Sequence, residues 1–306
     1  MSMRTSSALV VGEALVDIVV PLRGDRREYP GGSPANVAMT LGRLDRPVRL
    51  VTWLGEDARG RMVKDHLNES HVKITEESLG ARQTSTALAT LDASGAATYD
   101  FDLDWQVRDT QVDESVIVLH SGSIAATLEP GGSAVVDLMR ETRAQATITY
   151  DPNARPSIMG SAKGAYARAK EIIQIADVVK TSDEDVAWLT GCRSVEEVAK
   201  EWLDMGVSVV VVTRGGEGAM AFSADAEVHL PASDVDVVDT VGAGDSFMGG
   251  LIDALWSENL LGAHNRYALQ NVDEETLIRM LARAGSISAI TVSRAGANPP
   301  WKKELI

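Results

Sequence analysis

The chain has 306 residues, of which 44% are hydrophobic and 24% are charged, and its formal net charge is −15 at pH 7. A chain of this length and composition can bury a large core, either as one large α/β domain or as two domains. The surplus of acidic residues argues against a nucleic acid as partner, because the protein surface as a whole would repel a polyanion.

Membrane insertion and disulfide chemistry are not expected either. No apolar run approaches the roughly 20 residues that a membrane helix needs, and residues 1–7 form a short polar start without the apolar region of a signal peptide. Cys192 is the single cysteine, which excludes an intrachain disulfide and a cysteine-based zinc site. These features predict a cytoplasmic protein with neither a membrane nor a nucleic-acid partner.

Apolar runs rich in β-branched residues alternate with helical patterns along the chain. Strands are predicted at residues 9–11, 48–54, 116–120, 147–151, 177–180 and 207–213. Helices are predicted at residues 34–44, 57–68, 133–145, 162–175, 183–190 and 195–205. The last strand has four consecutive valines and is expected to be buried on both faces. This alternation predicts an α/β fold with a doubly wound, mainly parallel sheet flanked by helices.

Two segments, residues 16–30 and 84–105, break this alternation. In the second, residues 86–91 and 97–102 flank the turn residues 92–95 as the strands of a β-hairpin would. Together the two segments predict a small β-sheet lid. The chain shows no internal repeat and no Pro/Gly-rich linker, so the sequence gives no support for a clean domain boundary.

The most informative segment is Asp-Thr-Val-Gly-Ala-Gly-Asp-Ser-Phe at residues 239–247. The small residues Gly242, Ala243 and Gly244 precede Asp245, after which apolar residues recur at helical spacing. Such a junction points backbone N–H groups toward one place, where the helix dipole also favours negative charge, so it predicts an anion hole. Asp245 at its rim could take a proton from a group that attacks a phosphate. The structural alternative is an N-cap aspartate, although a cap would not need three small residues before it.

Two segments near the start of the chain offer polar groups for a ligand. Gly31-Gly32-Ser33-Pro34-Ala35-Asn36 opens a helix, and Asn36 offers both a donor and an acceptor to a sugar hydroxyl. Asp17 follows the first strand, at the edge of the sheet where ligands bind in doubly wound folds. The alternatives are a tight loop before a helix and a solvated aspartate in a turn.

In their order and separation, Gly31-Gly32-x-x-x-Asn36 and Asp239-Thr-x-Gly-Ala-Gly-Asp245 resemble the signature segments of ribokinase-like (PfkB-type) carbohydrate kinases. Three more segments extend the resemblance over nearly the whole chain: Asp151-Pro-Asn-x-Arg155-Pro156, Thr213-x-Gly215-x-x-Gly218 and Arg294-x-Gly296-Ala297. The resemblance implies a single α/β kinase domain over residues 1–306, with a β lid over the sugar that is often used for homodimer contacts.

The resemblance also implies roles for individual residues. Asp245 is expected to be the general base toward a primary hydroxyl of the sugar, with Gly242, Ala243 and Gly244 as the anion hole for the transferred phosphoryl group. The expected sugar contacts are Asp17, Gly32 and Asn36, together with Arg155 where the substrate carries a phosphate or an acidic group. The expected ATP contacts are Thr213, Gly215 and Gly218. The alternatives are a surface arginine at position 155 and a β-turn at residues 213–218.

Two metal ions are implied in the same way. Magnesium is expected with ATP, because hard oxygen ligands and substrate phosphates suffice to bind it. Many relatives order water around magnesium with Asn-x-x-Glu, where this chain has Ser182-Asp183-Glu184-Asp185, so Asp185 is the candidate; Ser182 and Asp185 could equally cap a helix. A potassium ion would fall among Asp239, Val241, Thr291, Arg294 and Gly296. Pro300 stands where ribokinase places a serine hydroxyl.

The sequence therefore predicts an ATP-dependent kinase that phosphorylates a primary hydroxyl of a small sugar. Fructose is the first candidate, because Gly-Gly-x-Pro-Ala-Asn resembles bacterial fructokinases and Ser33 stands where ribokinases tend to carry a lysine. Within the family, 2-keto-3-deoxygluconate, ribose and nucleosides remain alternatives. A catalytically silent sugar- or nucleotide-binding protein would have no reason to keep Gly-Ala-Gly-Asp245. A dinucleotide oxidoreductase would need G-x-G-x-x-G after the first strand, where Gly12-Glu13-Ala14-Leu15 stands.

Overall fold

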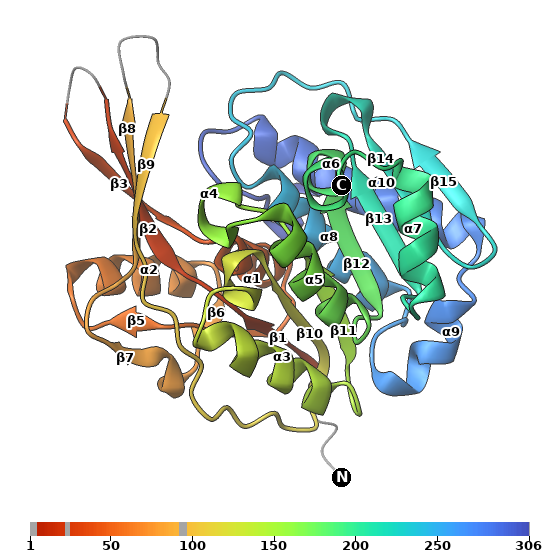
Figure 1. Cartoon of the computed structure of the whole chain (residues 1–306), viewed down its shortest axis with the longest axis horizontal. Coiled ribbons are helices and arrows are strands. Elements are labelled where there is room, and N and C mark those ends of the chain that lie inside the picture. Colours follow the sequence, from red (N-terminus) through yellow and green to blue (C-terminus); the bar gives the residue numbers. More distant parts are fainter. Residues whose placement is uncertain (1–4, 22–24, 92–96, 306) are drawn as a thin grey trace.

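A mainly parallel β-sheet forms the centre of the structure (Figure 1). The computed structural model describes residues 5–21, 25–91 and 97–305, and in this part of the chain the sheet has nine strands in the order β15-β14-β13-β12-β11-β10-β1-β4-β6. The pairings from β6 across to β13 are parallel, and β14 and β15 extend the edge antiparallel. The strands are β1 Ser7–Val11, β4 Val48–Val51, β6 Val72–Ile74, β10 Val116–Gly122, β11 Thr147–Asp151, β12 Val178–Ser182, β13 Val209–Thr213, β14 Ala219–Phe222 and β15 Glu227–Leu230.

Helices cover both faces of this sheet. They are α1 Ser33–Arg43, α2 Ala58–Glu69, α3 Gly131–Thr142, α4 Pro156–Met159, α5 Ala162–Ile173, α6 Asp183–Thr190, α7 Val195–Asp204, α8 Ala243–Ser257, α9 Arg266–Gln270 and α10 Glu274–Val292. α1, α2, α8 and α10 share one hydrophobic core with Val209 and Val211 of β13, whereas α3, α5, α6 and α7 pack with Val210 and Val212 on the other face. Successive strand residues point to opposite faces, so the valine strand is buried on both sides as expected, and the predicted α/β fold is confirmed.

One predicted strand is wrong at its end. The strand expected at residues 48–54 stops with β4, and β5 Leu54–Gly55 pairs instead with β7 Leu79–Ala81 in a separate two-stranded sheet. The strand ends here because the backbone N–H of Thr52 donates to the Ser78 hydroxyl at 2.9 Å and not to a neighbouring strand. A side chain thus takes the place of a neighbouring strand. The other predicted strands and helices lie within a few residues of their expected bounds.

The predicted lid is a four-stranded sheet that stands beside the main sheet, at the left of Figure 1. Its order is β3-β2-β8-β9, with β2 Leu15–Val20, β3 Arg27–Gly31, β8 Thr86–Leu91 and β9 Ala97–Asp102. β2 and β8 are parallel, and the outer pairs are antiparallel. The predicted hairpin turn at residues 92–95, and residues 22–24 of the first lid segment, lie outside the described residues. Because β2 begins four residues after β1 ends, Asp17 lies in a lid strand and not in a turn.

Two glycines let α8 approach its neighbours closely. A Cβ atom on Gly249 would lie 2.6 Å from Thr40 Cβ of α1, and one on Gly250 would lie 2.9 Å from Ala284 Cα of α10. Real Cβ atoms do not approach so near, so α8 could not sit between α1 and α10 at this distance with larger residues there. This packing brings the first turn of α8 to the first turn of α1.

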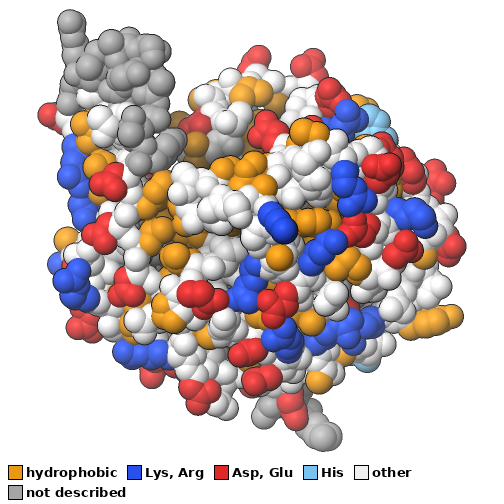
Figure 2. Space-filling model, viewed as in Figure 1, with side chains coloured by type: hydrophobic (Ala, Val, Ile, Leu, Met, Phe, Trp, Pro, Cys, Tyr) orange, Lys and Arg blue, Asp and Glu red, His pale blue; other side chains and the backbone are white. Residues whose placement is uncertain are grey.

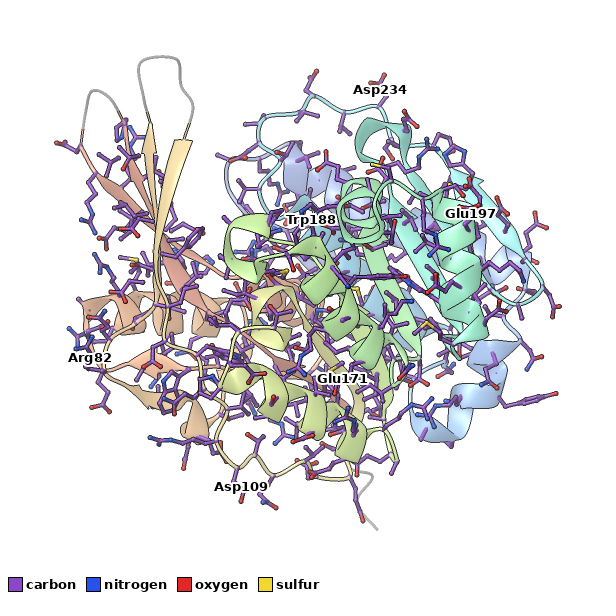
Figure 3. The ribbon with its side chains drawn as sticks, viewed as in Figure 1. Arg82, Asp109, Glu171, Trp188, Glu197 and Asp234 are labelled. Carbon is purple, nitrogen blue, oxygen red and sulfur yellow. The ribbon has the colours of Figure 1, made fainter. Side chains whose placement is uncertain are left out.

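On the face shown in Figure 2, acidic and basic side chains are interspersed. Glu171 of α5, labelled in Figure 3, forms ion pairs with Arg140 of α3 and with Arg168, with N–O distances of 2.5 Å and 2.7 Å. Exposed pairs of this kind contribute little stability each. In the described part of the chain, no helix combines the length and apolarity needed to cross a bilayer.

Candidate active site

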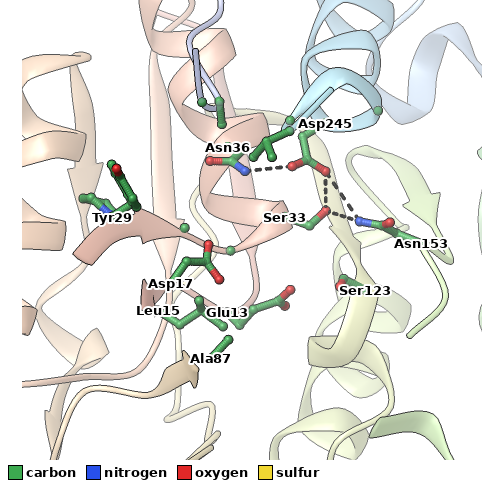
Figure 4. Close-up of a pocket in the computed structure, with 18 of the residues that line it drawn as sticks. Glu13, Leu15, Asp17, Tyr29, Ser33, Asn36, Ala87, Ser123, Asn153 and Asp245 are labelled. Carbon is green, nitrogen blue, oxygen red and sulfur yellow. Dashed lines mark hydrogen bonds between the residues drawn. The ribbon is translucent and has the colours of Figure 1, made fainter. Parts of the chain in front are cut away.

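The first turns of α1 and α8 meet at Asp245 (Figure 4). The Asp245 carboxylate is buried, with 7% of the residue exposed. Its Oδ1 accepts a hydrogen bond from Ser33 Oγ at 2.7 Å, and its Oδ2 accepts one from Asn36 Nδ2 at 2.8 Å. The N-cap of α8 is Gly242, and no side chain caps it. Asp245 is therefore not the helix cap that the structural alternative supposed.

A cavity of about 910 Å³ opens in front of Asp245, between the lid and the carboxyl ends of the strands. Many of the residues predicted for the site line it, namely Asp17, Gly32, Asn36, Arg155, Asp239, Val241, Gly242, Ala243, Gly244, Asp245 and Gly296. Segments from the start, middle and end of the sequence thus come together around one space. The remaining predicted residues lie outside its lining, namely Thr213, Gly215, Gly218, Asp185, Thr291 and Arg294.

The two glycines before α1 are required by close packing. A Cβ atom on Gly31 would lie 2.0 Å from Asp17 Oδ2, and one on Gly32, whose φ is 107°, would lie 2.4 Å from the carbonyl oxygen of Glu13. Larger residues would push the lid strand β2 away from α1. The Gly-Gly pair thereby fixes how Asp17 faces the cavity.

The predicted anion hole lies over a buried ammonium group. Gly242 has φ 76°, and a Cβ atom on Gly244 would lie 3.0 Å from Lys180 Nζ. Backbone N–H groups in the first turn of a helix lack helical acceptors. In α8 the N–H of Ala243 already donates to the Thr240 carbonyl at 3.2 Å, whereas those of Gly242 and Gly244 have no backbone acceptor in the described part of the chain and can bind an anion. Lys180 adds a full positive charge directly beneath them.

Lys180 forms a buried ion pair with Asp151, at 2.8 Å between Nζ and Oδ2. Burial by itself lowers the pKa of Lys180, but Asp151, Asp185 and Asp245 outweigh it and hold the pKa above its usual value. Burial raises the pKa of Asp151 to about 6, against the opposing effect of Lys180. Asp151 Oδ1 has no hydrogen-bond partner among the described residues. The sequence does not reveal this pair, because the pattern around each residue indicates only the end of a buried strand.

The lid side of the cavity is acidic. Glu13 lies between β1 and β2, and its Oε2 accepts a hydrogen bond from the N–H of Ala125 at 3.2 Å. Burial raises the pKa of Glu13 to about 7 and that of Asp17 to about 6, with Arg155 opposing both shifts. Glu13 was missed from the sequence, although an acidic residue directly after a buried strand and a glycine is a usable signal.

Arg155 lies at the mouth of the cavity. Its Nη1 donates to the Asn153 carbonyl at 3.1 Å, to Asn153 Oδ1 at 2.7 Å and to the Ala154 carbonyl at 3.0 Å. Asn153 in turn donates from Nδ2 to Ser33 Oγ at 2.7 Å. The sequence motif assigns no role to Asn153, but the structure joins it to Asp245 through Ser33.

The residues predicted to border ATP form a loop at the end of β13. The Thr213 hydroxyl donates to the Thr181 carbonyl at 3.2 Å, and the N–H of Arg214 donates to the Gly218 carbonyl at 2.8 Å. A Cβ atom on Gly218, whose φ is 100°, would lie 2.1 Å from the Leu230 carbonyl oxygen. The loop is thus the tight turn of the structural alternative, and a contact with ATP remains a prediction.

The residues predicted for metal ions already have protein partners. Asp239 accepts the N–H of Val241 at 3.0 Å and that of Gly296 at 2.8 Å. Asp185 forms the capping box with Ser182 that the sequence offered as an alternative, and its Oδ1 also accepts the N–H of Ala154 at 2.9 Å. In the described ranges, no three histidine, cysteine, aspartate or glutamate side chains are grouped to hold a metal ion.

The doubly wound sheet, the β lid and the anion-binding turn beside a held carboxylate define the ribokinase-like class of sugar kinases. Comparison with known proteins gives the family. A model described as "pfkB family carbohydrate kinase" matches residues 6–304. The chain belongs to the pfkB family, and it is a carbohydrate kinase.

The relatives include named fructokinases. The chain is 32% identical over 281 residues to a fructokinase of Rhizobium leguminosarum bv. trifolii, covering 88% of this chain and 85% of the relative. The structure resembles the fructokinase of Xylella fastidiosa with bound ATP, with a TM-score of 0.81 and 25% identity over 95% of this chain and 93% of that one. It also resembles the Vibrio cholerae O395 fructokinase, with a TM-score of 0.77 and 26% identity over 96% of this chain and 94% of that one. That protein was solved with fructose, ADP and calcium, and as a double mutant with fructose, ADP and potassium.

The buried Glu13 carboxyl predicts a pH-dependent stability. Its pKa is about 7 in the folded protein and near 4.5 in the unfolded chain, so the folded state holds a proton over this interval that the unfolded state has released. The free energy of unfolding therefore falls as the pH rises from about 4.5 to about 7. Glu13→Gln removes this ionisation and should reduce the fall by up to about 3 kcal/mol in denaturant titrations across this range.

Asp17 and Asp151 titrate in the same interval, so part of the fall should persist in Glu13→Gln. The matched control is Glu141→Gln, because Glu141 is exposed on α3. A pH profile of Glu13→Gln that is identical to that of the control would contradict the assignment.

Proposed function

We propose that this kinase transfers the γ-phosphoryl group of ATP to a primary hydroxyl of fructose, with Asp245 as the general base. One observation carries the proposal: Asp245 is held by Ser33 and Asn36 at the rim of the cavity, and the glycine-rich turn of residues 242–244 lines the same space. The fructokinase relatives support fructose as the sugar.

The chemical step needs little beyond positioning and electrostatics. Asp245 takes the proton of the hydroxyl as its oxygen attacks the γ-phosphorus. The new O–P bond forms as the bond to the leaving ADP oxygen breaks, and the proton remains on the Asp245 carboxyl. The N–H groups at Gly242 and Gly244, with that of Ala243 shared with the Thr240 carbonyl, then stabilise the charge on the transferred group, with Lys180 beneath them. A positioned base contributes about 10²- to 10⁴-fold to the rate.

The acidic cavity favours a neutral sugar over a sugar acid. Asp17, with Gly32 and Asn36, is placed to accept and donate hydrogen bonds to hydroxyl groups, and carboxylates accept two such bonds readily. The carboxylate of 2-keto-3-deoxygluconate would instead meet Glu13, Asp17 and Asp245. Arg155 is one of the arginines lining the cavity that could offset this, but its Nη1 is already engaged by Asn153 and Ala154.

ATP would lie against the loop of Thr213, Gly215 and Gly218 and the exposed valines before the anion hole. Val237 and Val238 are each 63% exposed there, as an apolar face for the base would be. Magnesium would be held through water by Asp151, whose Oδ1 has no hydrogen-bond partner among the described residues, and by Asp185. When bound, magnesium neutralises charge on the phosphates.

Several further properties belong to the same proposal. Residues 1–306 would act as one kinase domain, with the lid both covering the sugar and making homodimer contacts. The partners would be the sugar and ATP, with no nucleic acid or membrane. A cytoplasmic location would follow from the need for ATP.

Turnover and the role of Asp245 can be tested together by measuring ADP release with Mg-ATP and fructose, ribose, 2-keto-3-deoxygluconate, adenosine and other sugars. Fructose should give the highest kcat/KM. Asp245→Asn should lower kcat by at least about 10²-fold, because the base is lost, and keep the affinity for an ATP analogue. The matched control is Asp236→Asn, since Asp236 is exposed in the loop before the anion hole.

Two results would contradict the proposal. Near-normal kcat in Asp245→Asn would demote Asp245 to a structural residue. Turnover with no sugar of the panel would favour a silent sugar- or nucleotide-binding protein.

Potassium is expected to activate the enzyme through the loop around Asp239. Asp239 ties the anion hole at Val241 to the 294–296 loop at Gly296, and carbonyl groups of Thr291 and Arg294 would complete the ligands of the ion. The rate should be about 5-fold or more higher in potassium than in a buffer with only a bulky organic cation. Equal rates in potassium, sodium and ion-depleted buffer would remove this part of the proposal.

A further inference from the structure

A chain of hydrogen bonds runs from the mouth of the cavity to Asp245. Arg155 Nη1 donates to Asn153 Oδ1 at 2.7 Å. Asn153 Nδ2 donates to Ser33 Oγ at 2.7 Å, and Ser33 Oγ donates to Asp245 Oδ1 at 2.7 Å; Figure 4 shows these last two bonds. Asn153 Nδ2 also lies 3.5 Å from Asp245 Oδ1.

The chemistry of Arg155 fixes which group donates in each hydrogen bond between Arg155 and Asp245. A guanidinium group has donors and no acceptor, so Asn153 must turn its oxygen toward Arg155 and its NH₂ group toward Ser33. The Ser33 oxygen accepts that bond, and its single proton is left for Asp245. The Asp245 Oδ1 is thus held as an acceptor, which a base requires.

The backbone at Asn153 and Ser33 agrees with a role for their side chains. Asn153 has φ 38°, in the left-handed region that costs a residue with a Cβ about 1–2 kcal/mol. Glycine would adopt this conformation without strain but has no amide to offer. Ser33 begins α1, yet the N-cap is Gly32 and no side chain caps the helix. The buried Ser33 hydroxyl therefore does not cap the helix, as a serine near a helix start often does.

We propose that Asn153 is a positioning residue that acts through Ser33 to hold the Asp245 carboxylate in the orientation that takes the proton of the sugar. The inference rests on the proposed role of Asp245 as the base. Asn36 holds Oδ2 and Ser33 holds Oδ1, so rotation of the carboxylate is stopped at both oxygens. Without the Asn153 donor, the Ser33 proton is free to turn away, and the carboxylate is held at one oxygen only.

The test measures kcat and KM of Asn153→Gly, Ser33→Ala and the double variant with fructose and Mg-ATP. Glycine at position 153 keeps the left-handed backbone and removes only the amide. Each single variant should lower kcat by about 10- to 100-fold, as a misplaced reacting group does, with KM for fructose within about threefold. The double variant should be no slower than the slower single variant, because both changes break one chain.

Asn259→Gly is the matched control. Asn259 is exposed in the turn after α8 and has φ 56°, so the substitution makes the same backbone change away from the cavity. Its kcat should equal that of the wild-type enzyme. Thermal unfolding of all variants shows which of them fold.

Several outcomes would overturn the inference: kcat within twofold of wild type in both single variants, losses that multiply in the double variant, or losses confined to KM for fructose. If Asn153→Gly does not fold, the kcat of Ser33→Thr, which keeps the hydroxyl, is compared with that of Ser33→Ala. A higher kcat in Ser33→Thr than in Ser33→Ala supports the proposed hydrogen-bond chain, and an equal loss of kcat in both variants overturns it. A wild-type enzyme that turns over no sugar would contradict the proposed function itself, whereas normal turnover with unaffected variants would contradict only the role of Asn153.

Discussion

The contact between the first turns of α1 and α8 is the interaction on which the rest of the site depends. Ser33 and Asn36 of α1 reach Asp245 of α8 across more than 200 residues of sequence, and α8 comes this near only because Gly249 packs against Thr40. Helix N-termini attract negative charge, so two of them facing one space make a place for both an aspartate and a phosphoryl group. Lid residues and the glycines before α1 line the same space.

Holding these charges together is the main electrostatic problem of the site. The chain is acidic overall, and Asp151, Asp185 and Asp245 all act on Lys180. The buried ammonium group and the amides of the first turn of α8 supply the local positive potential that an acidic chain lacks in bulk. Burial raises the pKa of Glu13 to about 7 and that of Asp17 to about 6, so near neutral pH Glu13 is partly protonated whereas Asp17 keeps most of its negative charge and the lid side stays acidic.

The fold could be predicted well from the sequence, because period and composition are local properties. The alternation of strands and helices and the double burial of the valine strand follow directly from residue spacing. The end of β4 could not be predicted, since it depends on Ser78, a side chain 26 residues away from Thr52. The position of Asp17 on a lid strand likewise depends on pairing with β3 and β8.

The part of the site that could be predicted is the part that rests on local sequence patterns. The small residues before Asp245 give a local signal of an anion hole, and eleven of the predicted residues line one cavity. Lys180 and Asn153 were missed as site residues, because their contacts with Asp151 and Ser33 exist only in the tertiary structure. Glu13 was missed although its place after a buried strand and a glycine is a usable signal. The sequence pattern marks Ser33 only as the residue in place of a lysine, and its bond to Asp245 depends on the tertiary structure.

The most direct test of a site that joins a sugar hydroxyl to ATP is phosphorus NMR of the product formed by the wild-type enzyme from Mg-ATP and fructose. The geometry predicts one phosphomonoester on a primary hydroxyl of the sugar, formed in equal amount to ADP. Inorganic phosphate released at the same rate with or without fructose, or phosphate on a secondary hydroxyl, would contradict it.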